Sequence, residues 1–78
     1  MSSIYSEQYQ RVIKILRAAR HEKGLTQAQL AKALGRPQSF VAKTENGERR
    51  LDIIEFAYIA HLLSLDPADV LKMVLPKK

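Results

Sequence analysis

The chain has 78 residues, which is enough for one domain with a modest hydrophobic core. It contains no cysteine, and this excludes a disulfide framework and a thiolate metal site. The opening residues lack the basic and apolar segments of a secretion signal, and no apolar run reaches the about 18 residues of a membrane span. We therefore expect a soluble, cytoplasmic protein that forms a single domain over residues 1–78.

Positive charge is concentrated in the first part of the chain. Residues 11–50 hold ten Lys or Arg and three Glu, whereas residues 51–76 hold one Lys and four acidic residues. Chance clustering in a short chain is one explanation. A polyanionic partner is the explanation that we prefer, because a solvated surface has no need to separate its charges in this way.

A long first helix is predicted from near Ser6 to Lys23, with Gly24 ending it. Its apolar residues recur at spacings of three and four: Tyr5, Tyr9, Val12, Leu16 and Ala19, with Ile13 beside them. We interpret most of its basic residues as solvated charges, although the end of the helix could approach a phosphate. Neither His21 nor His61 has a metal-ligand spacing, and no catalytic or cofactor-binding motif is present, so we expect neither an enzyme nor a cofactor.

Residues 26–47 then predict a helix, a tight turn and a second helix. Thr26 and Gln29 have the spacing of a capping box, so the first of these helices should begin near Gln27. Gly35 can adopt the positive φ that ends it, and Pro37 suits the first position of the next helix. This layout is that of a helix-turn-helix, in which the second helix reads DNA.

The second helix of this motif, from Pro37 to about Asn46, has two different faces. At 100° per residue, one arc of about 140° holds Gln38, Ser39, Ala42, Lys43 and Asn46. Phe40 and Val41 lie on the opposite side. An ordinary solvated face is the alternative for such an arc, but the helix that precedes it favours base reading by Gln38 and Ser39, with Lys43 as a cation.

The rest of the chain predicts a loop and two further helices. Arg49 is the better phosphate candidate in the loop after the motif, while Arg50 could equally turn inward to pair with a carboxylate. Asp52 can cap a helix over residues 53–63, and Asp66 followed by Pro67 opens another over residues 67–75. Pro76 should end the fold, and we expect Lys77 and Lys78 to form a mobile tail.

The last third of the chain has more apolar residues than one core requires. Helix 53–63 offers a core stripe of Ile53, Phe56, Ala60 and Leu63, with Ile59 alongside, and helix 67–75 offers Val70. We predict that the remaining apolar residues form a homodimer interface: Ile54, Tyr58, Leu62, Leu71, Val74 and Leu75. The alternative is that the first helix folds back over them, with Tyr5 and Tyr9 as cover.

Taken in order, these pieces resemble the phage-repressor/Cro-type (XRE-type) helix-turn-helix family over about residues 12–71. The matching pieces are LRAARHEKG, Leu25-Thr26-Gln27, Leu30-Ala31, Leu34-Gly35, Lys43, Glu45-Asn46-Gly47 and the run from Leu51 to Leu71. The resemblance implies an all-α, compact five-helix domain whose helices 2 and 3 form the motif. Two residues depart from the family pattern, since Pro37 replaces a Ser or Thr cap and Thr44 replaces an apolar residue.

The resemblance also implies roles for individual residues. Gln27 would bind a DNA phosphate, Gln38 and Ser39 would read bases, Lys43 would contact a base or a phosphate, and Asn46 would touch the backbone. Arg20 and Glu45 would form a structural ion pair. The full set of DNA contacts that we predict is Gln27, Arg36, Gln38, Ser39, Lys43, Asn46 and Arg49.

We therefore predict a regulator of transcription that binds a specific sequence of double-stranded DNA, and that reads a palindromic operator as a homodimer. An alternative from another class is an antitoxin-like module that mainly binds a protein partner and touches DNA secondarily. Binding of single-stranded RNA fits the charge, but the sequence lacks an exposed aromatic platform for stacking bases.

Overall fold

Five helices follow one another along the chain: α1 (Ile4–Glu22), α2 (Gln27–Leu34), α3 (Gln38–Glu45), α4 (Ile53–Leu62) and α5 (Pro67–Val74). The computed structural model describes residues 4–76, with side chains from residue 7 onward. No strand occurs in this part of the chain, so the predicted all-α, five-helix fold is confirmed. The predicted tail of Lys77 and Lys78 lies outside the described residues.

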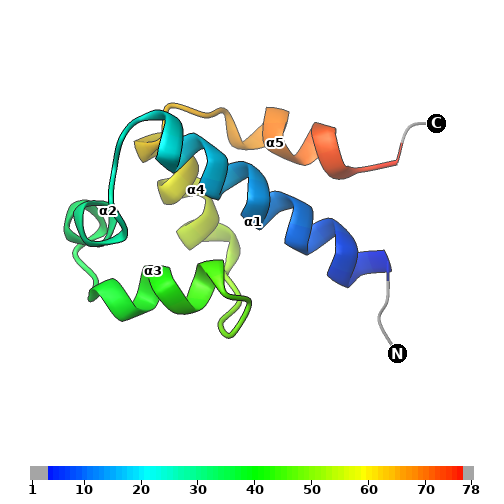
Figure 1. The fold of residues 1–78 in the computed structure, drawn as a ribbon. Helices are drawn as coiled ribbons and strands as arrows, with labels where there is room; N and C mark the ends of the chain where they lie inside the picture. The colour runs from blue at the N-terminus through cyan, green and yellow to red at the C-terminus, as the bar shows by residue number, and fades with distance from the viewer. Residues whose placement is uncertain (1–3, 77–78) are drawn as a thin grey trace.

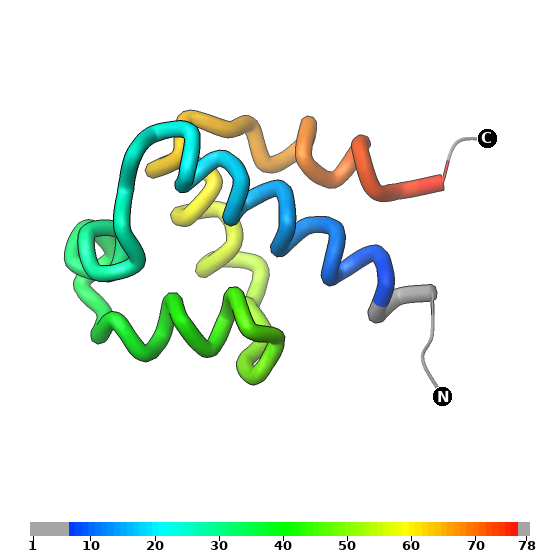
Figure 2. Tube along the Cα trace, in the orientation of Figure 1, coloured from blue at the N-terminus to red at the C-terminus, as the bar shows by residue number. Residues whose placement is uncertain are grey.

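The helices are arranged around α1 and α4. In Figure 1, α1 and α5 run side by side in opposite directions, and α3 lies on the other side of α1 from α5. Figure 2 traces the same path and shows α2 end-on, at the opposite end of the molecule from the two termini. Because α2 packs against both α3 and α4, the helix-turn-helix pair is attached to the rest of the fold through α4 and α1.

One hydrophobic core joins all five helices, and it contains Val12, Ile13, Leu16, Ala19, Leu30, Ala31, Phe40, Val41, Phe56, Ile59, Ala60, Leu63, Val70 and Val74. Four of the five residues predicted as the α4 core stripe are in this set. Ile53 was predicted wrongly, because it lies in the first turn of α4, where it is 75% exposed. Val74 was predicted as a surplus residue, but α1 covers it together with Val70.

The predicted helix ends are largely observed. Thr26 and Gln29 form the capping box of α2, and Gly35 ends that helix with φ +70°. Asp52 caps α4 in a second capping box with Glu55, and the Asp66 side chain caps α5. Pro37 corrects the prediction: its ψ of 154° is extended, so it is the residue before α3 and not its first helical residue.

Polar side chains of α1 hold α5 in place. Gln8 Nε2 donates to the carbonyl of Val74, and Arg11 donates to the carbonyl of Met73, both at 3.0 Å. These carbonyls belong to the last turn of α5, where a cation is favoured by the helix dipole. Although α1 covers Val70 and Val74, it leaves Ile54 and Tyr58 more than half exposed, so it does not provide the full cover considered above. The side chain of Tyr5 is outside the described residues.

Candidate nucleic-acid interface

An ion pair links α1 to the last residue of α3. Arg20 donates from Nε to one carboxylate oxygen of Glu45 at 2.7 Å, and from its terminal nitrogen to the other at 3.0 Å. The same guanidinium donates to the carbonyl of Leu25 at 2.7 Å, and Arg20 is 6% exposed. This two-point geometry fixes the angle between α1 and α3, and it confirms the ion pair that the family resemblance implied.

Glu45 keeps its charge although it is half-buried. Burial raises the pKa of its carboxyl. Hydrogen bonds from Arg20 and Gln27 and the charges of Arg20 and Arg17 together lower the pKa by more than burial raises it. The pKa therefore lies below the usual value of 4.5. The lowered pKa is consistent with a structural role, because a proton on Glu45 would weaken its paired contact with Arg20.

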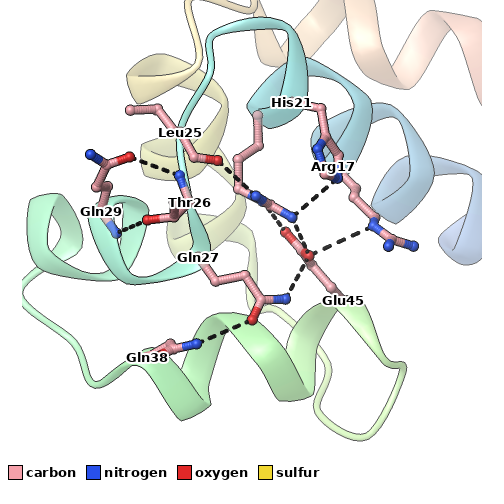
Figure 3. A network of polar contacts seen from close by, with 9 residues as sticks. Arg17, His21, Leu25, Thr26, Gln27, Gln29, Gln38 and Glu45 are labelled. Atoms are coloured by element: carbon pink, nitrogen blue, oxygen red, sulfur yellow. Dashed lines mark hydrogen bonds and ion pairs between the residues drawn. The ribbon is translucent and has the colours of Figure 1, made fainter.

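Gln27 and Gln38 lie next to this ion pair, as Figure 3 shows. Gln27 Nε2 donates to Glu45 at 3.0 Å, and Gln38 Nε2 donates to Gln27 Oε1 at 3.5 Å. The side chain of Gln27, which opens α2, is thus oriented by α3. Gln38, which opens α3, is exposed, and among the described residues its side chain makes only this long hydrogen bond, so its amide remains available to a ligand.

The polar face of α3 points into solvent as the helical wheel predicted. Gln38, Ser39, Lys43 and Asn46 are exposed, whereas Phe40, Val41 and Thr44 are buried. Ala42 is small and lies between the polar residues, so the helix axis can approach a surface closely there. The face therefore offers an amide, a hydroxyl and a cation on one helix of eight residues.

Arg36 and Arg49 are held by a contact that the sequence analysis missed. Arg49 donates to both carboxylate oxygens of Glu55, at 2.9 and 3.0 Å, and Arg36 donates to the same carboxylate at 3.3 Å. Both guanidinium groups also lie over the ring of Phe40, at 4.2 Å for Arg36 and 4.5 Å for Arg49. We call Arg36, Arg49, Glu55 and Phe40 the arginine clamp. It ties the turn before α3 and the loop after it to the start of α4.

Glu55 is strongly acidic in this setting. The hydrogen bonds from Arg49, followed by the backbone N–H of Asp52, lower the pKa of its carboxyl to about 2. Arg50, in contrast, does not pair with a carboxylate among the described residues, and it stacks on the ring of Tyr9 at 4.4 Å. Of the two loop arginines, it is Arg49 that turns toward an acidic partner.

The part of the chain from residue 4 to residue 76 contains neither a helix that could span a membrane nor a cluster of metal-ligating side chains. None of its helices has the length and the apolar character needed to cross a membrane. Its His, Asp and Glu side chains form no group of three that could hold a metal ion. His21 and His61 are both exposed.

Comparison with known proteins agrees with this geometry. Residues 15–72 match a family described as a helix-turn-helix domain. A solved structure of an XRE-family like protein from Pseudomonas syringae pv. tomato str. DC3000 is similar, with a TM-score of 0.86 and 48% identity over 91% of this chain and 87% of that one. A search of curated protein sequences gives no significant match. The chain therefore belongs to the XRE-type helix-turn-helix family of DNA-binding regulators.

Proposed function

We propose that this protein regulates transcription by binding a specific sequence of double-stranded DNA, with α3 in the major groove. The observation that carries the proposal is the exposed face of α3, where Gln38 and Ser39 lie at the N-terminal end of the helix. In helix-turn-helix proteins this end contacts the base edges. A Gln amide can donate from Nε2 to N7 of adenine and accept at Oε1 from the N6 amino group, a two-point pairing that no other base offers. A Ser hydroxyl can pair with any base.

Other polar groups around this face would supply affinity. Gln27 and Asn46 flank the two ends of the polar face, and Lys43 lies one turn after Ser39. Contacts from such groups to phosphates fix the register of the protein on the duplex, but they carry no sequence information. Arg36 and Arg49 belong to the arginine clamp, so any phosphate contact that they make would be shared with Glu55.

The proposal is tested by substituting Gln38 by Ala and measuring affinity for a preferred duplex and for a random duplex. We expect the binding free energy for the preferred duplex to weaken by about 1–3 kcal/mol, and the preference at one base position to relax. The affinity for the random duplex should change little. Lys72→Ala is the matched control, because Lys72 is exposed on α5, on the far side of α1 from α3. Equal losses on both duplexes would show that Gln38 does not read a base.

We further propose that the protein acts as a homodimer with twofold symmetry. The apolar surface of α4 and α5 supports this, since Ile53, Ile54 and Tyr58 are 61–75% exposed and Leu71 and Leu75 are 39% and 56% exposed. Leu62 is half-buried against the core, and Val74 is buried, so these two contribute less to the interface than predicted. A dimer through this surface would present two copies of α3 to successive turns of DNA, about 34 Å apart.

A further inference from the structure

A basic hollow lies between α1 and the loop that follows α3. Its volume is about 260 Å³, and its polar lining includes Lys14 and Arg17 from α1 and Arg50 from the loop. Glu45 and Asn46, at the end of α3, also line it. We call this site the α1 hollow. It is large enough for several water molecules, each of which occupies about 30 Å³ in the liquid, and so for a solvated anionic group.

The charges of the α1 hollow are not balanced by the protein. Glu45 is the single carboxylate in its lining, and it is already bonded at both oxygens to Arg20. Arg17 approaches that carboxylate only to 3.9 Å and keeps a side chain that is 60% exposed. Over the described residues, neither Lys14 nor Arg50 has a carboxylate within 4.0 Å. Three cations therefore line one small volume with a single carboxylate, and Arg20 already pairs with that carboxylate.

One of the three cations is held in place before any ligand arrives. The guanidinium of Arg50 lies 4.4 Å from the centre of the Tyr9 ring. The Tyr9 hydroxyl in turn accepts a hydrogen bond from the backbone N–H of Leu51 at 3.0 Å. Because this contact fixes the aromatic ring relative to the loop, binding an anion would cost less side-chain entropy at Arg50 than at a free surface arginine.

The α1 hollow adjoins the face of α3 that we propose to read bases. Contacts run from Gln38 to Gln27, from Gln27 to Glu45 and from Glu45 to Arg17, and Figure 3 shows these side chains together. The eight residues of α3 span about 12 Å, which matches the about 12 Å width of the major groove. If α3 crosses the groove with its start at the base edges, its end would lie near the phosphates that border the groove.

We propose that the α1 hollow binds a phosphate group of the DNA backbone, with Lys14, Arg17 and Arg50 as its ligands. This proposal rests on the proposed DNA-binding function, and it extends the contact surface from the helix-turn-helix to the first helix. The bound phosphate would neutralise the excess charge of the hollow, and its counterions would be released from the duplex.

The test is the salt dependence of binding for Lys14→Gln, for Arg50→Gln and for the double variant. Each lost phosphate contact should reduce the slope of log K against log salt by about 0.9, and the double variant should reduce this slope by about twice as much. The preferred sequence should stay the same. Lys14 has no hydrogen-bond or ion-pair partner among the described residues, so Lys14→Gln should leave the fold intact, which an unfolding curve checks.

Lys72→Gln is the control, because it removes one positive charge from α5, away from α3. If the wild type binds a specific duplex while Lys14→Gln and Arg50→Gln behave like this control, the proposal is overturned and the proposed function stands. If the wild type binds no duplex, both are overturned. Replacing one phosphate of the duplex by an uncharged methylphosphonate should weaken wild-type binding at one backbone position. The same replacement should leave binding by the double variant unchanged.

Free phosphate is the other source of the same chemistry. Titrations with sodium phosphate and with sodium chloride at equal sodium concentration separate the two sources, because counterion release depends on the cation. A backbone site predicts that both salts displace the duplex equally. Saturable binding of inorganic phosphate that the double variant loses would assign the α1 hollow to a free anion, and this result would contradict the proposal.

Discussion

Thr44 shows how a single residue can depart from the pattern of its family and still fit the fold. The resemblance places an apolar residue at this position, and the structure buries Thr44 to 4% exposure inside the core face of α3. Its methyl group packs there as an apolar residue would. Its hydroxyl oxygen, however, is buried with no hydrogen-bond partner among the described residues. A buried polar atom without a partner costs about 1–3 kcal/mol.

Thr44→Val should therefore stabilise the protein. The substitution keeps the shape of the side chain and removes the unsatisfied hydroxyl, so we expect the free energy of unfolding to rise by about 1 kcal/mol. Urea unfolding followed by circular dichroism measures this. Thr44→Ser is the comparison, since it keeps the hydroxyl and deletes the buried methyl, and it should lower stability by about 1 kcal/mol. A less stable Val variant would mean that the hydroxyl is bonded after all.

Residue roles were predictable where a local pattern or the family motif defines them. The exposed positions of Gln38, Ser39 and Lys43 follow from helical periodicity alone. The pairing of Arg20 with Glu45 spans 25 positions, and only the resemblance to a known family could indicate it. The role of Glu55 was missed, because its two arginine partners come from different loops and no spacing along the chain brings them together.

At the scale of elements, helix ends were predicted well wherever a few adjacent residues define the cap. Examples are the capping boxes at Thr26 and Asp52 and the glycine turn at Gly35. Pro37 was assigned one position too far into α3, because its fixed φ suits both the cap and the first helical residue, and only ψ separates them. No side chain caps α3 at Pro37, and the arginine clamp instead holds the turn before α3 through the contact of Arg36 with Glu55.

The arginine clamp predicts a pH dependence of stability. The pKa of Glu55 is about 2 in the folded protein, below its usual value of 4.5. A lowered carboxyl pKa adds stability above the unfolded pKa, and this contribution is lost as the pH falls from about 4.5 to about 2. Because its arginine partners face solvent, we expect a contribution of about 1 kcal/mol at neutral pH.

Urea unfolding of the wild type and Glu55→Gln across this acidic range measures the contribution. The variant should be less stable at neutral pH, and its stability should fall less steeply with acid. Glu48→Gln, which removes an exposed carboxylate from the same loop, should behave like the wild type. Identical acid dependence in the wild type and Glu55→Gln would show that the clamp does not lower the pKa of Glu55.

At the scale of the whole molecule, the apolar surplus of the last two helices was predicted, but its distribution was only partly right. Periodicity cannot tell which of two apolar arcs on α5 faces α1. In the structure, Val74 lies on the arc that is buried, whereas Leu71 and Leu75 lie on the exposed arc. Ile53 was assigned to the core because it continues the stripe of Phe56 and Ala60. The first turn of α4 projects past the core, so this isoleucine adds to the exposed surface.

Leu71→Glu tests whether this surface joins two copies of the chain. We expect light scattering at micromolar concentration to give a dimer mass for the wild type and a monomer mass for Leu71→Glu, because a buried unpaired carboxylate is costly. Met73→Glu is the matched control, since Met73 is 56% exposed on another side of α5 and should leave the dimer intact. A monomeric wild type, or a dimeric Leu71→Glu, would remove this surface from the proposed interface.

The central claim is sequence-specific DNA binding by α3, and selection of duplexes from a random pool tests it most directly. The account predicts an enriched inverted repeat whose half-sites are centred about 10 base pairs apart, or a multiple of one helical turn. It also predicts that Gln38→Ala loses the preference at one position of each half-site. A pool without any enriched sequence, or an enriched sequence that Gln38→Ala selects unchanged, would contradict the claim.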